Sequence, residues 1–581
     1  MKWALTLVVV LLSVIAPAAA SANSWTSTAD MPYYQWGGAA GITTVGDHIL
    51  LAGGFGFDRN RVYAGLRTGF LGGNNAGQIS WERGLGLPGS ARGGLALAKA
   101  PDGRIYMMGG QTLKHVLNAT VYRTSGTSWV RRASMPSPRT DLAAVATPDG
   151  RIFAIGGAVY AAGRYSPTVT VQIYDIATDT RSSGPPLPSP RSELGAALGA
   201  DGRIYAFGGF DSGARREAFS LDPNDLAGGW SELPPMPSPH ELTSAVTGPD
   251  GTMYVIGGWD GLRDLRRVDT YNPTVEGWRC TVPMSQGRSW APAIASTWGM
   301  AAFGGANGST LLGSHEFLRW SSIPVDHEPP VTTTPPTGHV PPGQVPLTNV
   351  PFVVSWADSD ALTDIRDQTM LVTTDAGASY TPVAMPWPTI KSLRFTQYPG
   401  FPRLRFQMTP RDCPGNIGPA ADGPGFSTHA APETGARYAG GWQTGNSATA
   451  RGGHTRYSSN PRATATFSFT GREIALFAPK SAGRGAARIS VDGHYVTTIT
   501  EYAKITTPRV VVFRHSFVRT GEHRITIRPV GTPGRPRVDI DGFLFIGAPA
   551  PLPATSAQAR IPASGLHADV PRSGRRPAPG R

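Results

Sequence analysis

The ten-residue stretch PDGRIYMMGG, residues 101–110, returns three more times along a chain of 581 residues. The later copies are PDGRIFAIGG at 148–157, ADGRIYAFGG at 200–209 and PDGTMYVIGG at 249–258. Self-similarity at a fixed period indicates a repeat architecture, in which each copy is one supersecondary unit that packs against its neighbours. The repeat therefore predicts how the chain is built before any residue suggests what the protein does.

The repeat predicts two strands joined by a tight turn. Each copy has an Asp-Gly pair before a short, continuously apolar segment, which is typical of a strand buried on both faces. We expect Asp-Gly to form a two-residue hairpin turn, because glycine adopts the positive φ angles that this turn requires. The diglycine that ends each copy lets backbones approach closely where strands converge. It occurs six times, roughly fifty residues apart: Gly53-Gly54, Gly109-Gly110, Gly156-Gly157, Gly208-Gly209, Gly257-Gly258 and Gly304-Gly305.

A third and a fourth strand are expected after each diglycine. The third carries Tyr122, Tyr174, Leu221 or Tyr271, and the fourth usually begins with tryptophan, at Trp81, Trp129, Trp230 and Trp278. In one copy Arg181 stands where tryptophan is expected. Four strands per copy and six copies predict an all-β propeller over residues 23–322. Trp25 precedes the first copy and the last copy ends near Trp320 without a fourth strand, so the N-terminal strand is expected to close the last blade.

These features resemble the kelch family. Its hallmarks are a diglycine after an apolar strand, a tyrosine followed several residues later by tryptophan, and Met-Pro-x-x-Arg before the next repeat, as in residues 135–139. The resemblance spans about residues 24–322. It implies a six-bladed kelch β-propeller.

Two further β domains are expected after the propeller. Residues 323–344 are rich in proline and threonine, which predicts a semi-rigid linker or an edge strand. Residues 345–428 contain VVSWADSDALTD and RDCPGNIGP and resemble a fibronectin type III or related immunoglobulin-like β-sandwich, with Trp356 in its core.

Residues 436–547 alternate polar and apolar residues between turns, which predicts an antiparallel jelly-roll. Their motifs ARYAGGWQTG, FSFTGREI, ISVDGHYV and VDIDGFLFI resemble a bacterial family of carbohydrate-binding-module-like jelly-rolls. Residues 548–581 are rich in proline and arginine and are expected to be disordered.

The N-terminus predicts export. Residues 1–22 place Lys2 before a short apolar run and end in Ala-Ser-Ala, which is typical of a signal peptide, so the mature chain is expected to begin near Asn23. The run is too short to span a bilayer, and no other segment predicts a transmembrane helix in the mature chain. We expect a secreted protein, either released or held at the cell surface. The two cysteines, Cys280 and Cys413, fall in different expected domains, which favours two buried thiols over a bridge.

The charge favours anionic partners electrostatically, although a solvated arginine-rich surface is the alternative that explains it more simply. The net charge is +13, carried mainly by arginine, but no nucleic-acid-binding motif accompanies it. We therefore expect an extracellular polysaccharide or a cell-surface protein as the partner, and no nucleic acid.

Basic residues recur at one position before the first strand of successive blades: Arg92, Arg139, Arg191, His240 and Arg288. Loops after the diglycines add further cations, among them Arg216 and Arg263. If these side chains converge at the mouth of the channel, they would suit a carboxylate or a sulfate. The alternative is that they bridge neighbouring blades, because a repeated position is itself a structural signature.

The jelly-roll offers a second candidate site. Aromatic residues that could stack on a sugar ring are Trp442, His454, Tyr457, Tyr495 and Tyr502, and Asp541 or Asp492 could accept hydrogen bonds from sugar hydroxyls. The resemblance to carbohydrate-binding modules implies this role. The alternative for Trp442 and Tyr457 is a place in the core.

No metal or other cofactor is expected. Asp358, Asp360 and Asp364 have oxygen ligands that suit calcium, but no glycine or downstream glutamate completes a loop around them. We therefore expect binding without catalysis. The alternative is a sugar-active kelch enzyme, either similar to sialic acid mutarotases, with Glu217 beside Arg216, or, less well supported, similar to galactose oxidase, whose histidine and tyrosine copper ligands find no match here.

Overall fold

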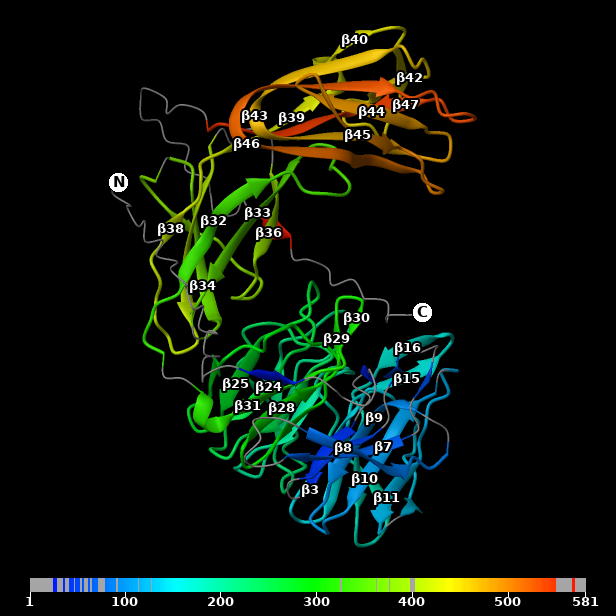
Figure 1. The fold of residues 1–581 in the computed structure, drawn as a ribbon, viewed down its shortest axis with the longest axis vertical. Helices are drawn as coiled ribbons and strands as arrows, with labels where there is room; N and C mark the ends of the chain where they lie inside the picture. Colours follow the sequence, from blue (N-terminus) through cyan, green and yellow to red (C-terminus); the bar gives the residue numbers. More distant parts are fainter. Residues whose placement is uncertain are drawn as a thin grey trace, which may run out of the picture. The chain divides into compact units, whose positions relative to one another are not determined.

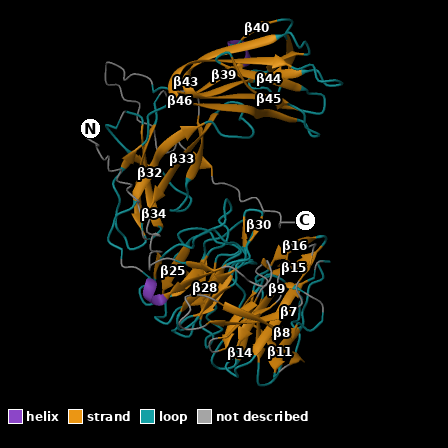
Figure 2. Cartoon of the chain, in the orientation of Figure 1, coloured by secondary structure: helices purple, strands orange, loops and turns teal. Residues whose placement is uncertain are grey.

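The computed structural model describes residues 25–28, 35–36, 41–45, 48–52, 55–56, 61–62, 65–71, 79–89, 92–112, 114–126, 128–323, 326–361, 363–375, 377–397, 403–549 and 567–569. These residues are all-β, with two short 3-10 helices, η1 (Trp320–Ser322) and η2 (Glu433–Gly435), and no α-helix (Figures 1 and 2). None of their helices is long and apolar enough to cross a membrane. The expected signal peptide lies outside this part of the chain. The chain forms two compact units, with the C-terminal unit starting at residue 326.

The described N-terminal unit contains six four-stranded antiparallel sheets. They are β3 (Gly41–Val45), β4 (His48–Ala52), β7 (Gly65–Leu71) and β8 (Ile79–Gly86); β9 (Gly93–Lys99), β10 (Ile105–Gln111), β11 (Val121–Ser125) and β12 (Ser128–Arg132); β13 (Ala143–Ala146), β14 (Arg151–Ile155), β17 (Val171–Asp175) and β18 (Thr180–Ser183); β19 (Gly195–Leu198), β20 (Ile204–Phe207), β21 (Ala218–Leu221) and β22 (Trp230–Leu233); β23 (Ser244–Thr247), β24 (Met253–Ile256), β25 (Val268–Asn272) and β26 (Gly277–Cys280); and β27 (Ala293–Ala295), β28 (Gly299–Phe303), β31 (His315–Arg319) and β1 (Thr26–Thr28). Smaller sheets are formed by β2 (Gln35–Trp36), β5 (Phe55–Gly56) and β6 (Arg61–Val62), by β15 (Ala158–Ala161) and β16 (Arg164–Pro167), and by β29 (Ala306–Asn307) and β30 (Thr310–Leu311).

The first strands of these sheets lie side by side in a closed ring. β3 lies against β9, and the contacts continue through β13, β19, β23 and β27, which returns to β3. The N-terminal strand β1 pairs antiparallel with β31, with Thr26 opposite Phe317, which is the sheet where the sequence placed it. The buried Trp25 donates its indole Nε1–H to Val282 O at 2.8 Å. One sheet thus holds strands from both ends of the unit.

The Asp-Gly turns are wider than the expected two-residue turn. In the first, Ala100 N donates to Arg104 O and Gly103 N donates to Ala100 O, both at 2.9 Å. Gly103 has a φ of 74°, whereas Asp102 keeps a negative φ and accepts a hydrogen bond from Arg104 N at 3.0 Å. The side chain of the aspartate holds the turn open, and only the glycine adopts the left-handed conformation that closes a three-residue loop.

The C-terminal unit contains two β domains. The first consists of the sheet β32 (Val331–His339), β33 (Val350–Ser359), β36 (Ser392–Gln397) and β49 (His567–Asp569), and the sheet β35 (Thr381–Pro382), β34 (Ile365–Thr373), β37 (Arg405–Asp412) and β38 (Ala421–Asp422). The second consists of the sheet β39 (Ser427–Pro432), β48 (Gly542–Gly547), β43 (Thr464–Lys480), β46 (Thr507–Pro529), β44 (Ala486–Val491) and β45 (His494–Thr500), with β40 (Arg437–Ala439) beside β43, and the sheet β41 (Gln443–Asn446), β42 (His454–Ser458) and β47 (Val538–Ile540).

Two segments differ from the simplest expectation. Within the Pro/Thr-rich stretch, which left a linker or an edge strand open, residues 331–339 form the edge strand β32, because β33 supplies backbone partners to them. Within the expected disordered tail, residues 567–569 form β49 and pair with β36, so disorder is wrong for this segment. Backbone pairing needs no apolar pattern, which is why composition did not reveal it.

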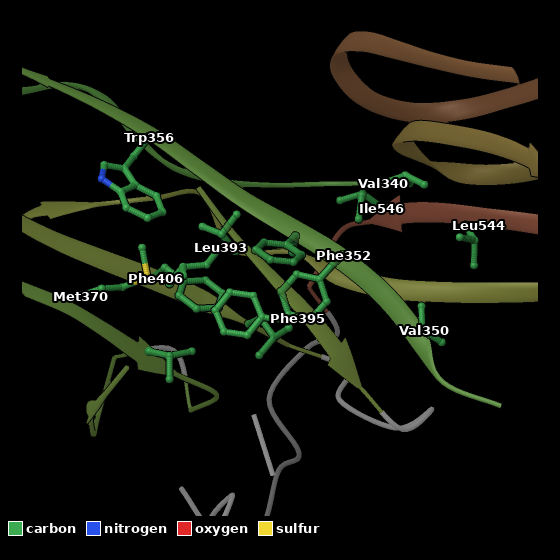
Figure 3. Packing of buried hydrophobic residues seen from close by; sticks show 14 of the residues in the cluster. Val340, Val350, Phe352, Trp356, Met370, Leu393, Phe395, Phe406, Leu544 and Ile546 are labelled. Carbon is green, nitrogen blue, oxygen red and sulfur yellow. The ribbon is translucent and has the colours of Figure 1, made fainter. Parts of the chain in front are cut away.

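The two C-terminal domains share one hydrophobic core. Phe352, Phe395 and Phe406 stack in the first domain, and Leu544 and Ile546 of β48 complete the same cluster from the second (Figure 3). Trp356 is buried in this core, as the sequence predicts. Arginines of the second domain also donate to backbone carbonyls of the first: Arg472 to Gly338 at 3.0 Å, Arg514 to Val340 at 2.9 Å, Arg509 to Val345 at 2.7 Å and Arg451 to Asn349 at 2.8 Å.

Both cysteines are oxidised. Cys280 and Cys413 are disulfide-bonded, and the described chain has no free thiol. The expectation of two inert thiols is wrong, since the placement of cysteines in different domains does not exclude oxidation.

Candidate functional site

The ring of basic residues in the N-terminal unit is buried. Arg92, Arg139, Arg191, His240 and Arg288 are each at most 2% exposed. Each donates a hydrogen bond to the carbonyl of the first glycine in its own repeat: Arg92 to Gly109 at 3.3 Å, Arg139 to Gly156 at 2.6 Å, Arg191 to Gly208 at 2.9 Å, His240 to Gly257 at 2.7 Å and Arg288 to Gly304 at 2.8 Å. Their burial and these hydrogen bonds favour the structural alternative, and an anion-binding role of this ring stays a prediction.

The same residues link neighbouring sheets. The carbonyl of Arg191 accepts a hydrogen bond from Gly157 N of the preceding repeat at 2.8 Å, while its side chain holds Gly208 of its own repeat. Gly156 and Gly157 have φ angles of 59° and 93°, and a Cβ on Gly156 would lie 2.4 Å from the Arg191 carbonyl oxygen. The buried cation thus contacts the diglycines of two successive repeats and connects their sheets.

Carboxylates balance three of the buried cations. Arg191 pairs with Glu217 at 3.0 Å, and Arg288 pairs with Glu316 at 2.9 Å. Burial alone would raise the pKa of Glu217, but the charge of Arg191, hydrogen bonds to the carboxylate and the charge of Arg215 together lower the pKa below its usual value. An ionised carboxylate held in this way has no proton to deliver, so Glu217 does not suit the general acid of a mutarotase.

The third pair replaces arginine by histidine. His240 Nε2 lies 2.9 Å from an oxygen of the fully buried Asp269, and His240 Nδ1 donates to the Gly257 carbonyl. Protonated histidine donates from both ring nitrogens, so it can fill the place of arginine. Asp269 also accepts from Arg267 Nε at 2.6 Å. Burial would raise the pKa of Asp269, but Arg267 and His240 together lower it below its usual value.

The other predicted residues of this unit lie in loops. Arg216 is half-buried, and burial lowers its pKa. The Arg263 side chain is 54% exposed and lies 3.5 Å from Asp260 within its own loop. A role for these two in ligand binding stays a prediction.

The residues predicted in the jelly-roll region have different surroundings. Trp442 packs against the core beside Tyr438, with ring centroids 5.2 Å apart, which supports its alternative place in the core. Asp541 is 1% exposed and accepts from Arg451 N at 2.8 Å, and burial raises its pKa to about 6. His454 lies 3.4 Å from the buried Glu433. Asp541 is therefore buried and already holds a backbone N–H, and its role in sugar binding stays a prediction.

Tyr457 and Tyr502 form the core of a different arrangement, which we call the tyrosine–arginine site. The Arg537 guanidinium lies 3.6 Å from the centroid of the Tyr457 ring, and Arg535 lies 4.2 Å from that of Tyr502. The Tyr457 hydroxyl donates to Gln443 at 2.6 Å. Two tyrosine rings are thus each stacked on an arginine of the same short segment.

Two buried acids fix the arginines. Asp539 is fully buried and binds Arg537 Nη2 at 2.8 Å and Arg484 Nε at 2.5 Å, and its backbone N–H donates to Glu501 at 2.8 Å. Glu501 is also fully buried, which raises its pKa well above the usual value. The guanidinium groups of Arg484 and Arg537 therefore share the carboxylate of Asp539, and Arg535, which stacks on Tyr502, adds a third positive charge to the site.

The acids and arginines of this site were missed in the sequence. The signal was present in RPRVD, residues 535–539, where every second residue is charged. Alternation of this kind places Arg535, Arg537 and Asp539 on one face of the extended segment that leads into β47. This alternation indicates a strand, and the charges that it places on one face were overlooked.

Three carboxylates of the first C-terminal domain form a compact group. Asp326, Asp360 and Asp412 each offer one oxygen, and these atoms lie within 4.8 Å of one another. Hydrogen bonds from Thr363 to Asp326 at 2.9 Å and from Asn416 N to Asp412 at 2.7 Å occupy part of the group. We assign no ion to it.

The comparisons with known proteins concern the N-terminal unit. A family model described as Kelch motif matches residues 243–285, which contain the four strands of the sheet β23–β26. No curated protein sequence matches the chain. The Kelch motif and the all-β structure together support a kelch-type β-propeller.

Proposed function

We propose that the protein is secreted and binds an extracellular glycan without catalysing a reaction. We infer that the six four-stranded sheets are the blades of one propeller, that residues 345–428 are a fibronectin-type sandwich and that residues 436–547 are a carbohydrate-binding jelly-roll. The observation that carries the proposal is the tyrosine–arginine site, in which stacked aromatic rings and fixed guanidinium groups occur together.

The chemistry of this site suits an acidic sugar. Tyrosine presents an apolar ring face on which the C–H face of a pyranose packs, together with a hydroxyl for hydrogen bonding. Guanidinium groups bind carboxylate or sulfate through paired N–H donors. Since Asp539 already holds Arg484 and Arg537, little side-chain entropy is lost when a ligand binds.

The test is a glycan array with the full-length mature protein. Deletion of residues 436–547 would remove part of the shared core, so point variants are preferable. We expect Tyr457→Ala and Tyr502→Ala each to weaken binding to acidic glycans by about tenfold, the equivalent of about 1.4 kcal/mol.

Tyr495→Ala is the matched control. Tyr495 is 59% exposed and stacks on Arg488 at 5.4 Å, but no buried acid is seen to hold that arginine among the described residues. Its variant is expected to bind like the wild type. Equal loss in all three variants, or binding that Tyr457→Ala and Tyr502→Ala leave unchanged, would exclude the tyrosine–arginine site.

A further inference from the structure

A cluster of three aromatic side chains lies outside the ring of buried cations. His115 follows β10, and Tyr160 and Tyr165 face each other across the hairpin β15–β16. Both segments directly follow a diglycine, in two neighbouring sheets of the N-terminal unit. We call these three residues the rim cluster.

The rings of the rim cluster pack closely. His115 stacks on Tyr160 with centroids 5.5 Å apart and planes 15° apart, and Tyr160 lies 4.7 Å from Tyr165. Tyr160 remains 38% exposed, and His115 is also exposed. An aromatic group built from two sheets therefore presents a face to solvent.

A chain of hydrogen bonds sets the orientation of the imidazole. The Tyr165 hydroxyl donates its one proton to Oε1 of the buried Gln111. Tyr165 Oη therefore accepts from His115 Nδ1, which lies 2.5 Å away. His115 Nε2 is left to accept a hydrogen bond when the ring is neutral. The backbone of His115 has a φ of 59°, a conformation that few residues other than glycine adopt.

Two cations flank the cluster. Lys114 precedes His115 and Arg164 precedes Tyr165, and both are exposed. In the next two repeats, the equivalent loops neutralise their arginines internally: Arg215 pairs with Asp211 at 3.0 Å and Arg263 with Asp260 at 3.5 Å. Residues 111–118 and 158–168 contain no acidic residue, so these loops have no such internal partner. The rim cluster is therefore aromatic and flanked by two exposed cations with no acid in their own loops, whereas Arg215 and Arg263 each pair with an acid within theirs.

We propose that the rim cluster is a second glycan-binding site and that its ligand is a hexuronic acid residue of a polysaccharide. The pyranose packs on the exposed face of Tyr160, a sugar hydroxyl donates to His115 Nε2, and the carboxylate pairs with Lys114 and Arg164. This inference rests on the proposed function but uses residues of the other unit. Two weak sites on one chain would raise the affinity for a polymer through avidity.

The test is isothermal titration of the full-length mature protein with three probes: a hexamer of galacturonic acid, its methyl ester and a neutral hexamer of glucose. We expect Tyr160→Ala to weaken binding of the acidic hexamer by about tenfold, because the stacking surface is lost. The double variant Lys114→Ser/Arg164→Ser is expected to lose affinity and salt dependence together. Since these side chains are exposed, the melting temperature should stay unchanged.

The controls separate this inference from the proposed function. Tyr495→Ala is expected to bind the acidic hexamer like the wild type. Unchanged binding by Tyr160→Ala together with loss in Tyr457→Ala overturns the rim cluster and leaves the proposed function standing. Equal affinity for the methyl ester overturns the role of the cations. No binding of any probe by the wild type overturns both proposals.

Discussion

The guanidinium of Arg181 lies 4.8 Å from the centroid of the Tyr174 ring, and its Nε donates to Ala133 O of the preceding sheet at 2.9 Å. Elsewhere tryptophan makes the same two contacts. Trp278 lies 5.1 Å from Tyr271 and donates Nε1–H to Pro234 O at 2.6 Å. Arginine can replace tryptophan here because both offer a flat group and an N–H donor.

Replacement of Arg181 tests this equivalence. Burial lowers the pKa of Arg181 to about 10, which shows that the site disfavours the charge. We expect Arg181→Trp to unfold at the same or a higher temperature than the wild type. Arg181→Ala should cost about 1–3 kcal/mol, because the Ala133 carbonyl loses its donor. Thermal unfolding followed by circular dichroism measures both, and a marked loss in Arg181→Trp would refute the equivalence.

The close approach at the diglycine predicts that alanine destabilises the protein more at Gly156 than at Gly163. Gly156 and Gly163 have φ angles of 59° and 75°, so alanine is strained at both positions. A Cβ on Gly156 would lie 2.4 Å from the Arg191 carbonyl oxygen, whereas a Cβ on Gly163 would meet nothing within 4 Å. We expect Gly163→Ala to cost about 1 kcal/mol, from the backbone alone. Gly156→Ala should cost clearly more in urea unfolding, and equal costs would contradict the close contact between sheets.

Asp269 predicts a dependence of stability on pH. Its pKa is lowered in the folded state, so the stability that it contributes is present above its unfolded pKa and lost as the pH falls through the folded pKa. Asp269→Asn should cost about 3–5 kcal/mol at neutral pH, because His240 and Arg267 are left without their buried counter-charge. Urea unfolding at pH 7 and at lower pH measures this, and the variant should lose less stability on acidification than the wild type. An unchanged slope would show that Asp269 is not ionised in the fold.

The oxidation state of the cysteines can be checked directly. Cys280 and Cys413 are disulfide-bonded, so the unreduced protein in guanidinium chloride should give no reaction with a thiol reagent. After reduction and desalting it should give two equivalents, since the chain has two cysteines. A full thiol signal before reduction, from protein produced under oxidising conditions, would contradict the oxidised state of the two cysteines.

The repeat predicted where the strands lie, because strand positions depend on local sequence. The sequence could not show whether the repeated basic residues would be exposed or buried. That choice depends on how closely neighbouring sheets pack, and Arg139 looks the same in sequence whether it faces a channel or the Gly156 carbonyl. The sequence predicted a two-residue Asp-Gly turn, whereas the structure has a three-residue loop. The difference arises because the Asp102 side chain accepts a hydrogen bond within the turn, which sequence spacing does not show. Asp539 lies in β47 and Glu501 directly follows β45, so only the fold brings them together.

The shared core of the C-terminal unit limits how its two domains can change. Leu544 and Ile546 complete a cluster around Phe352, and arginines from the second domain hold carbonyls of the first. The second domain cut from this chain would carry an uncovered apolar face and unused arginine donors. Recombination between genes should therefore transfer the two domains as a pair, and a search for the second domain in other contexts should find either the same neighbour or substitutions at these contact positions.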